Sequence, residues 1–417
     1  AAGGALPPPP AGAAQASNPN ESYMELRDVK PRDDRADLLA FKRMELCSRF
    51  VDKADRGPAR LADIHQLNVE DLVAGYFFNA EPEELGGEQR EQVRQMAEHL
   101  IRFGEAPPLA PGRNDRLFCQ RVYIDPVPIT HRALLVYALT TLAVPVVEYA
   151  AFRSLGFQRV DRGPVYFYRR RGLEAGAQPL VFFHGFGVGP LPYIPAILAF
   201  GQLQHGDLYV VTSPHVSMRL GAGVPSAKGF AQVVVDMLAR DGHRRAHFVG
   251  HSFGTISLRR VLGFAREVVL TATFVDPVCF LMDKLMTRRI ISGLGREGMQ
   301  HAWIDLIIRY LAIEEATIAR TVMRDLDFMS TALWPEELRD VPSFVVLAEA
   351  DSITVAHSIR RLLKAEAQKR GSACAPLELM WCKGAPHGLV LWHPRLLREL
   401  WRAVARFMES ANRYNRD

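Results

Sequence analysis

A serine stands between two glycines in the stretch AHFVGHSFGTISLRR, which covers residues 246–260. Ser252 follows an apolar, β-branched run and precedes apolar residues at helical spacing, so we expect a strand, a sharp turn and a helix. A serine in such a turn can attack acyl groups as a nucleophile. Gly250 and Gly254 fit the turn, because a side chain two residues before or after the serine would collide with neighbouring backbone. The same letters also fit a glycine-rich turn without chemistry.

The serine hydroxyl needs a base that takes its proton and a carboxylate that orients the base. The preferred base is His387, in KGAPHG after the last apolar run, whereas His393 falls inside the final helix. Two acids, Asp351 and Asp276, each close an apolar run. The order serine, Asp351, His387 is the order expected when the nucleophile occupies a strand-to-helix turn. Asp351 also fits the cap of a helix that begins near residue 355, so Asp276 remains a rival acid at this point.

The negative charge that develops during acyl transfer needs two N–H donors. The stretch FFHGFGVGP, residues 182–190, follows an apolar run, and its glycines let the backbone approach a site closely. We expect the N–H groups of Phe186 and Phe253 to form this oxyanion hole. The other members of the motif are His184, Gly185 and Gly187.

Two other kinds of site fit these residues poorly. A nucleotide-binding loop has the spacing G-x-G-x-x-G, but the glycines here are spaced G-x-G-x-G, and Asp207 starts the next strand instead of ending it. His243, His247 and His251 have the H-x-x-x-H spacing of a metal site, but residues four apart on a strand are separated by about 13 Å. We therefore expect no metal and no cofactor.

The elements that must position these residues alternate between strands and helices from residue 156 onward. FQRVDRGPVYFYRRRG predicts a hairpin, with the basic run Arg169–Arg171 in a turn. Six apolar runs predict strands: PLVFFHG, DLYVVTSP, AHFVGH, VVLTATFVDP, SFVVLAEAD and LELMWCKG. Helical spacing occurs at about 190–202, 226–240, 253–267, 355–369 and 389–412. This alternation predicts a mostly parallel sheet with helices on both faces and a site beyond the carboxyl ends of its strands.

Together, the H-G-F-G and G-H-S-F-G motifs, the strand-end aspartate and the loop histidine resemble the α/β-hydrolase superfamily over residues of about 156–412. The resemblance implies an α/β-hydrolase fold, with Ser252 as nucleophile, His387 as base and Asp351 rather than Asp276 as acid. The segments DKLMTRRIISGL and WIDLIIRYLAIEEATIARTVMRDLDFMSTALWPEEL, and the N-terminal extension, are similar to a poorly characterised eukaryotic group of membrane-associated α/β-hydrolase-like proteins. That similarity implies a helical cap, residues 278–340, between core segments 156–277 and 341–417.

The N-terminal third differs from the core in composition and in the spacing of its apolar residues. Residues 1–21 are rich in Ala, Pro and Gly and carry no charge before Glu21, so we expect a disordered tail. Residues 22–131 have apolar residues at three-to-four spacing, which predicts a helical extension with Asn68 as a helix N-cap. The segment 132–155 is apolar almost throughout, interrupted by one proline and Glu148. It has the length of a membrane span, but it also fits a helix at a membrane surface or a buried helix.

Composition limits the partners. The net charge of +5 comes mostly from scattered arginine pairs without an aromatic-interleaved basic face, so we expect no nucleic-acid binding. An anionic membrane surface is a better partner for this charge. Five cysteines without a C-x-x-C pair indicate a reducing compartment rather than a disulfide framework. We expect an intracellular, membrane-associated protein, and the sequence leaves its oligomeric state open.

A serine nucleophile in this setting predicts hydrolysis of carboxylic esters. The apolar run from Trp303 to Ile313 in the predicted cap favours lipid or long-chain acyl esters, if part of it lines the pocket rather than the core of the cap. An acyltransferase would use the same residues, with an alcohol in place of water. A binding or scaffold protein would keep them without catalysis.

Overall fold

The structure is a computed structural model that describes residues 23–25, 46–47, 49–54, 59–103, 107–119, 121, 124–127, 129–174, 176–203, 205–282, 314–371 and 374–414. Three predictions fall outside these residues: the disordered tail at 1–21, the helical insert at 283–294 and the apolar run from Trp303 to Ile313.

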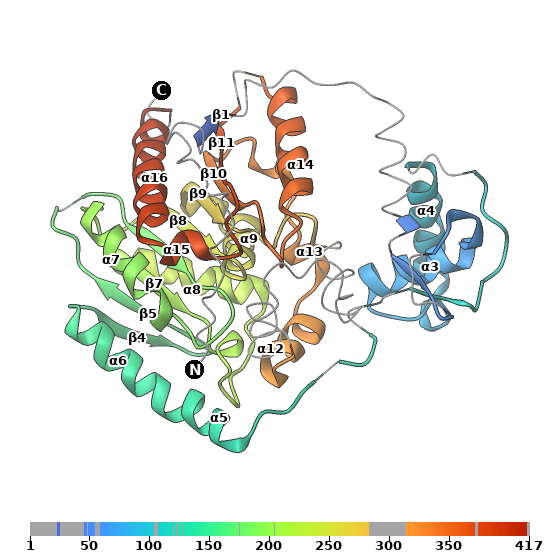
Figure 1. Cartoon of the computed structure of the whole chain (residues 1–417), viewed down its shortest axis with the longest axis horizontal. Helices are drawn as coiled ribbons and strands as arrows, with labels where there is room; N and C mark the ends of the chain where they lie inside the picture. The colour runs from blue at the N-terminus through green and yellow to red at the C-terminus, as the bar shows by residue number, and fades with distance from the viewer. Residues whose placement is uncertain are drawn as a thin grey trace, which may run out of the picture.

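A nine-stranded sheet forms the centre of the molecule (Figure 1). Its order is β1-β11-β10-β9-β8-β6-β7-β5-β4, in which β6 to β11 pair in parallel and β1, β4 and β5 are antiparallel. The strands are β1 (Tyr23–Glu25), β4 (Gln158–Arg162), β5 (Val165–Arg170), β6 (Leu180–Phe183), β7 (Leu208–Thr212), β8 (Ala246–His251), β9 (Val269–Val275), β10 (Ser343–Ala348) and β11 (Leu377–Cys382). Since β6 has both β7 and β8 as neighbours, the chain order reverses there, and crevices for ligands form at such points.

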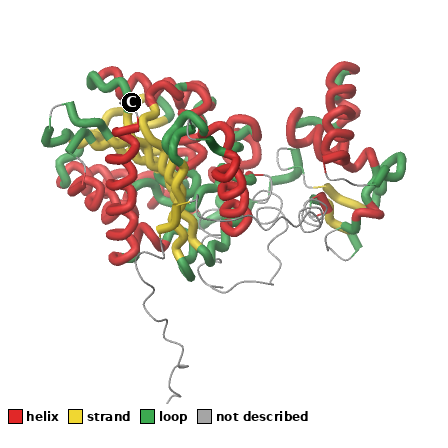
Figure 2. Tube along the Cα trace, turned by 90° about the horizontal axis from the view of Figure 1, so that it is seen from above, coloured by secondary structure: helices red, strands yellow, loops and turns green. Residues whose placement is uncertain are grey.

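Helices cover both faces of this sheet, which Figure 2 shows as yellow strands between red helices. One apolar cluster contains α8 (Ala227–Arg240), α9 (Gly254–Phe264) and α14 (Ala356–Lys369). The other contains α7 (Ile194–Leu203), α15 (Leu389–Trp392) and α16 (Pro394–Tyr414). Alternate residues of β6 belong to different clusters: Val181 and Phe183 to the first, Leu180 and Phe182 to the second. A strand buried on both faces reads as a continuous apolar run, which is why these strands could be predicted.

The six predicted parallel strands, the hairpin and the core helices are confirmed. One detail is wrong: Arg169 and Arg170 belong to β5 rather than to a turn. They pair with Tyr209 and Leu208 of β7, and the Arg169 guanidinium lies 2.7 Å from the carboxylate of Asp207. The ladder and this ion pair extend the strand through the basic run.

The apolar segment predicted at 132–155 is a continuous helix, Leu134–Ser154. It consists of α5 (Leu134–Ala138), a π-helical turn (Leu139–Ala143) and α6 (Val144–Ser154). Among the described residues, this helix is the one that is long and apolar enough to cross a membrane. The interpretation as a buried helix is wrong, because 17% of its apolar window is buried.

The predicted helical extension at 22–131 is not helical throughout: β1 joins the central sheet, and the later part forms a small lobe beside it (Figure 1). The lobe holds α3 (Gln66–Val73) and α4 (Gly87–Phe103), but also the antiparallel pair β2 (Phe50–Asp52) and β3 (Leu117–Cys119). Helical spacing failed to predict β2 because its partner strand comes much later in the chain. The N-cap of α3 is His65 rather than Asn68; the Asn68 side chain reaches back and accepts the His65 N–H at 3.1 Å.

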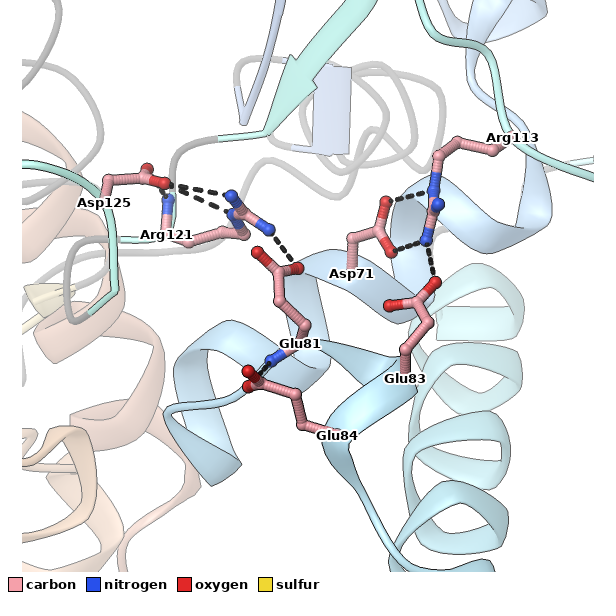
Figure 3. A network of polar contacts seen from close by, with 7 residues as sticks. All are labelled: Asp71, Glu81, Glu83, Glu84, Arg113, Arg121 and Asp125. Carbon is pink, nitrogen blue, oxygen red and sulfur yellow. Dashed lines mark hydrogen bonds and ion pairs between the residues drawn. The ribbon is translucent and has the colours of Figure 1, made fainter.

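Charged side chains fasten the segments of this lobe together (Figure 3). Arg113 forms two hydrogen bonds with the Asp71 carboxylate, at 2.7 and 2.9 Å, and a third with Glu83 at 2.9 Å. Arg121 pairs with Glu81 and, at 3.2 Å, with Asp125. These pairs connect the helical part of the lobe to the strand that returns toward the core.

The described part of the predicted cap consists of short helical segments, which contact the lobe. These are α12 (Ala316–Arg320), a π-helical turn (Thr321–Asp325), α13 (Phe328–Thr331) and a 3₁₀ turn (Pro335–Leu338). The Phe328 ring packs edge-on against Tyr76 and Phe77 of the lobe, with centroids 5.8 and 5.6 Å apart. The lobe is thus attached to the sheet domain through the segment that follows β9.

Candidate active site

The predicted strand-to-helix turn is present, between β8 and α9. Ser252 has φ 52°, a left-handed conformation that is rare for residues other than glycine. A Cβ atom at Gly250 would lie 2.5 Å from the Gly254 carbonyl oxygen, and one at Gly254 would lie 2.2 Å from the Phe183 carbonyl oxygen. The steric reason for both glycines is confirmed.

Backbone hydrogen bonds hold Ser252 in this conformation. Its N–H donates to the carbonyl of Val275 at 3.0 Å, which links the turn to the end of β9. Its carbonyl accepts from the N–H and from the hydroxyl of Thr255, at 2.9 and 2.6 Å. Ser252 is 5% exposed. The neighbouring strand and the first turn of α9 therefore compensate for the strained backbone.

His387 and Asp351 lie together, as predicted. The Nδ1 atom of His387 is 2.8 Å from Oδ2 of Asp351. Asp351 also accepts the N–H groups of Ile353 and Thr354, at 2.7 and 2.8 Å, and the hydroxyl of Thr354 at 2.7 Å. Burial raises the pKa of Asp351, but His387 and these donors outweigh it, so the pKa lies below its ordinary value. Asp351 is thus held ionised beside the imidazole.

Asp276, the rival acid, has different partners. It is fully buried and accepts the N–H groups of Ala348 and Gly388, at 2.9 and 2.7 Å. Burial, and the charge of Asp351, raise the pKa of Asp276 to about 6. Gly388 follows His387 directly, so Asp276 fixes the loop that carries the imidazole. Both oxygens of Asp276 thus accept backbone N–H groups, whereas the Nδ1 atom of His387 faces Asp351.

Asp276, Asp351 and His387 also have the atoms of a metal site, since their ligand atoms lie within 4.8 Å of one another. Both carboxylates, however, already accept N–H or O–H groups of the chain at each oxygen. This donor-rich surrounding is that of hydrogen-bonded carboxylates, not of metal ligands. The set therefore fits an acid–base arrangement better than a metal centre.

The loop predicted to form the oxyanion hole, here called the oxyanion loop, follows β6. It packs against the strand-to-helix turn that carries Ser252, here called the elbow. The rings of Phe186 and Phe253 are stacked, with centroids 4.8 Å apart. Neither amide N–H has an acceptor among the residues that the structure describes. Gly187 and Gly189 have φ of 137° and 94°, conformations that suit glycine. The oxyanion hole at Phe186 and Phe253 stays a prediction, with which this lack of acceptors is compatible.

A polar chain that sequence reasoning missed ties this loop to the elbow. The Gly185 N–H donates to the Tyr193 hydroxyl at 3.1 Å, and that hydroxyl lies 2.9 Å from Nδ1 of His251. The ring of His251 packs against that of His387, with centroids 5.3 Å apart. No sequence signal marks Tyr193, because it meets His251 only through the packing of α7 against the sheet.

His184 holds the oxyanion loop through hydrogen bonds at its other side. Its Nδ1 lies 2.7 Å from the carbonyl of Gly185, and its Nε2 accepts the N–H of Ser213 at 3.1 Å. Burial lowers the pKa of His184 to about 4, which keeps the ring neutral and able to accept that hydrogen bond. His184 thus links the ends of β6 and β7.

The residues of the weaker alternatives lie elsewhere. His393 is exposed at the end of α15. His243 and His247 contact Asp207 and Thr271, at 3.2 and 2.9 Å. Asp207 precedes β7, as predicted.

A cavity of about 550 Å³ lies far from Ser252, at the opposite ends of the strands. Leu180, His247 and Leu270, at or near the amino ends of β6, β8 and β9, form part of its wall, and Trp401 of α16 forms another part. The candidate catalytic residues follow the carboxyl ends of the strands, so this cavity is not their substrate site.

Comparison of the chain with models of known protein families identifies one family. A family model described as "Alpha/beta hydrolase family" matches residues 180–400, more than half of the chain, and spans Ser252, Asp351 and His387. No curated protein matches.

Several solved structures are similar. A membrane phospholipase A, described as a bacterial virulence factor, is 14% identical with a TM-score of 0.44, over 67% of this chain and 94% of its own. Naproxen esterase from Bacillus subtilis is 20% identical with a TM-score of 0.41, over 63% and 96%. Monoacylglycerol lipase from Paleococcus ferrophilus is 17% identical with a TM-score of 0.42, over 59% and 99%.

Proposed function

Because this chain belongs to the α/β-hydrolase family, we propose that it is a serine hydrolase that cleaves carboxylic esters through an acyl-enzyme on Ser252. The observation that carries the proposal is the hydrogen bond between Asp351 and His387 at the end of the sheet where Ser252 occupies a strained turn. A nucleophile, a base and an orienting acid are the groups that acyl transfer needs.

In the first step, the Ser252 hydroxyl oxygen attacks the ester carbonyl carbon, and its proton passes to Nε2 of His387. Nδ1 of His387 faces Asp351, which orients the ring and stabilises the imidazolium. The carbonyl π electrons move to oxygen, and the N–H groups of Phe186 and Phe253 stabilise the resulting oxyanion. The tetrahedral intermediate collapses, the alkoxy group leaves with the proton from His387, and an acyl-enzyme remains.

In the second step, His387 takes a proton from water, whose oxygen attacks the acyl carbon. The second tetrahedral intermediate uses the same two N–H groups. Its collapse breaks the bond to Ser252, which regains its proton from His387, and releases the carboxylic acid. The proton of Ser252 leaves with the alcohol and is replaced by one from water, so Ser252 and His387 end the cycle in their starting protonation states, and no metal or cofactor enters it.

We propose lipid or long-chain acyl esters as the substrate class. The half-buried ring of Phe186, stacked on the buried ring of Phe253, places apolar surface beside the proposed oxyanion hole. An apolar pocket gains about 0.8 kcal/mol for each methylene that it buries. A long acyl chain would use such a surface better than a short one.

A fluorophosphonate probe tests the nucleophile directly, since it labels activated serines. We expect labelling of the wild-type chain and none of Ser252→Ala or of His387→Ala, with all three proteins folded by circular dichroism. Equal labelling of Ser252→Ala would place the nucleophile elsewhere. Absence of labelling and of turnover in the folded wild type would favour a binding or scaffold protein.

A series of p-nitrophenyl esters of increasing acyl length tests the substrate class. We expect kcat/KM to rise with chain length. A maximum at acetate would overturn the lipid assignment and leave the hydrolase assignment in place. Adding glycerol and analysing the products separates hydrolysis from acyl transfer to an alcohol.

A further inference from the structure

The helix Leu134–Ser154 exposes a continuous apolar face. Seven of its side chains are between 47% and 80% exposed: Leu134, Leu135, Leu139, Leu142, Val146, Val147 and Tyr149. We call these seven residues the apolar ridge. Soluble proteins rarely leave so many large apolar side chains together in water without a partner.

The opposite face of the helix is fixed to the sheet domain. Glu148 is fully buried, and its carboxylate accepts from the hydroxyls of Tyr166 and Tyr168 at 2.6 and 3.0 Å and from Arg219 at 2.7 Å. The Thr140 hydroxyl lies 2.7 Å from the carbonyl of Met218. A membrane-spanning arrangement would break these contacts and expose Glu148 to hydrocarbon, so the helix is a surface helix.

The exposed side of the helix carries no charged side chain before Arg153. Between Arg132 and Arg153, Glu148 is the charged residue, and it faces inward. The apolar ridge is therefore uncharged over its whole length. Arg153 at the end of the helix and Arg162 of the adjacent strand β4 are exposed, whereas Asp161 of that strand is paired with Arg159. This edge of the molecule thus combines apolar side chains with a basic border.

The helix that carries the apolar ridge lies beside the loop of the proposed oxyanion hole. The Leu220 N–H donates to the Thr141 hydroxyl at 3.2 Å, so the loop after β7 contacts the helix, and Leu220 is itself 48% exposed. The same loop binds the oxyanion loop, since the Gly187 N–H donates to the Val216 carbonyl at 3.2 Å. A Cβ atom at Gly189 would lie 2.8 Å from the Glu148 carboxylate. The buried face of the helix thus contacts the loop that begins the candidate site.

We propose that the apolar ridge and Leu220 dock the protein on the surface of a lipid bilayer, with the helix parallel to the membrane plane. Amphipathic helices bind in this way when an apolar face enters the boundary between headgroups and acyl chains. Exposed arginines at its border favour anionic lipids. Docking brings the loop of the proposed oxyanion hole near the lipid, a placement that serves catalysis if the proposed ester hydrolysis holds.

Vesicle flotation of the full chain tests the docking without requiring catalysis. The vesicles are phosphatidylcholine alone and phosphatidylcholine with phosphatidylserine. The test variant is Leu135→Gln/Leu139→Gln/Leu142→Gln. Its matched control replaces three exposed apolar residues outside the ridge: Leu173→Gln/Phe264→Gln/Met329→Gln.

We expect the wild type and the control to float, and to float more strongly with phosphatidylserine. The partition coefficient of the test variant should be lower by at least about tenfold. Circular dichroism and thermal unfolding verify that each variant folds. Failure of the wild type to float with either vesicle, or equal flotation of the test variant, would overturn the proposal.

Two further measurements separate the alternatives. In analytical ultracentrifugation, a wild-type dimer that the test variant abolishes, with no vesicle binding, would make the ridge a subunit interface and overturn lipid docking. Flotation of Ser252→Ala should equal that of the wild type. Fluorophosphonate labelling without flotation would refute the docking alone, and flotation without labelling would refute the hydrolase alone.

Discussion

Asp351 and Asp276 are two buried carboxylates at the ends of neighbouring strands, and their surroundings move their pKa values in opposite directions. His387 and the donors of Thr354 lower the pKa of Asp351, whereas burial and the nearby charge of Asp351 raise that of Asp276. Asp351 is therefore held as an anion beside the imidazole, whereas Asp276 accepts the backbone N–H groups of the neighbouring loops. This difference in environment separates two residues that both follow the carboxyl ends of neighbouring strands.

Replacing each acid by its amide separates their roles. We expect Asp351→Asn to lower kcat by about 10³–10⁴-fold, because an amide cannot orient His387 in the required tautomer. Asp276→Asn should lose no more than about tenfold, the effect of one backbone hydrogen bond. Steady-state rates on a chromogenic ester measure both. A larger loss in Asp276→Asn would make Asp276 the catalytic acid.

The raised pKa of Asp276 predicts a dependence of stability on pH. Between about pH 4 and the folded pKa of about 6, the folded state keeps a proton that the unfolded chain has lost. The contribution of Asp276 to the free energy of unfolding therefore falls as pH rises through this window, by roughly 2–3 kcal/mol. Asp276→Asn cannot titrate, so the wild type should lose stability relative to this variant between about pH 4 and pH 7. Urea unfolding of both proteins at each pH measures the difference, and a constant difference would contradict the raised pKa.

Among the elements, α9 places two glycines in opposite situations. Gly254 at its start touches the backbone of β6, whereas a Cβ atom at Gly263 near its end would meet a terminal nitrogen of Arg259, 2.9 Å away. We expect Gly254→Ala to destabilise the fold by about 3 kcal/mol or more, since backbone cannot move aside. Gly263→Ala should cost about 1 kcal/mol or less, because one side-chain nitrogen can shift and alanine favours helix. Chemical unfolding midpoints compare the two, and equal losses would disprove the close contact at the elbow.

The helix Leu134–Ser154 depends on one buried ion pair. The side chain of Arg219 is 8% exposed, and it contacts Glu148 and the hydroxyl of Tyr166. Glu148→Gln leaves the guanidinium buried without its counter-charge, so we expect a loss of about 3–5 kcal/mol. The double variant Glu148→Gln/Arg219→Met removes both charges and should recover most of this loss. If both variants are equally unstable in thermal unfolding, the loss of packing rather than the unpaired charge is responsible.

In the whole molecule, the N-terminal lobe meets the sheet domain at Phe328. This ring is 7% exposed and packs against Tyr76 and Phe77 of the lobe. Phe328→Ala should destabilise the protein by about 3 kcal/mol and let the lobe unfold at a lower temperature than the sheet domain. The control is Met329→Ala, whose side chain is 60% exposed. Calorimetry should show two transitions for Phe328→Ala and the wild-type profile for the control; a single shifted transition would mean that lobe and sheet unfold together.

Local pattern was sufficient for much of the molecule. Continuous apolar runs identified the six parallel strands, because such strands are buried on both faces, and helical spacing identified the helices between them. The G-H-S-F-G motif identified the elbow at Ser252, because only glycines avoid collisions two residues before and after it. The order of Ser252, Asp351 and His387 could also be read from the chain.

Contacts between distant segments required the tertiary structure. The pairing of β2 with β3, the bridge from Gly185 through Tyr193 to His251, and the inward turn of Glu148 toward Arg219 join residues with no common local pattern. The partner of His387 belongs to the same group, since Asp351 and Asp276 both end strands and only their approach to the imidazole distinguishes them. Short-range sterics and apolar periodicity act within a few residues and are therefore visible in sequence, whereas hydrogen-bond partners and burial depend on how whole elements pack.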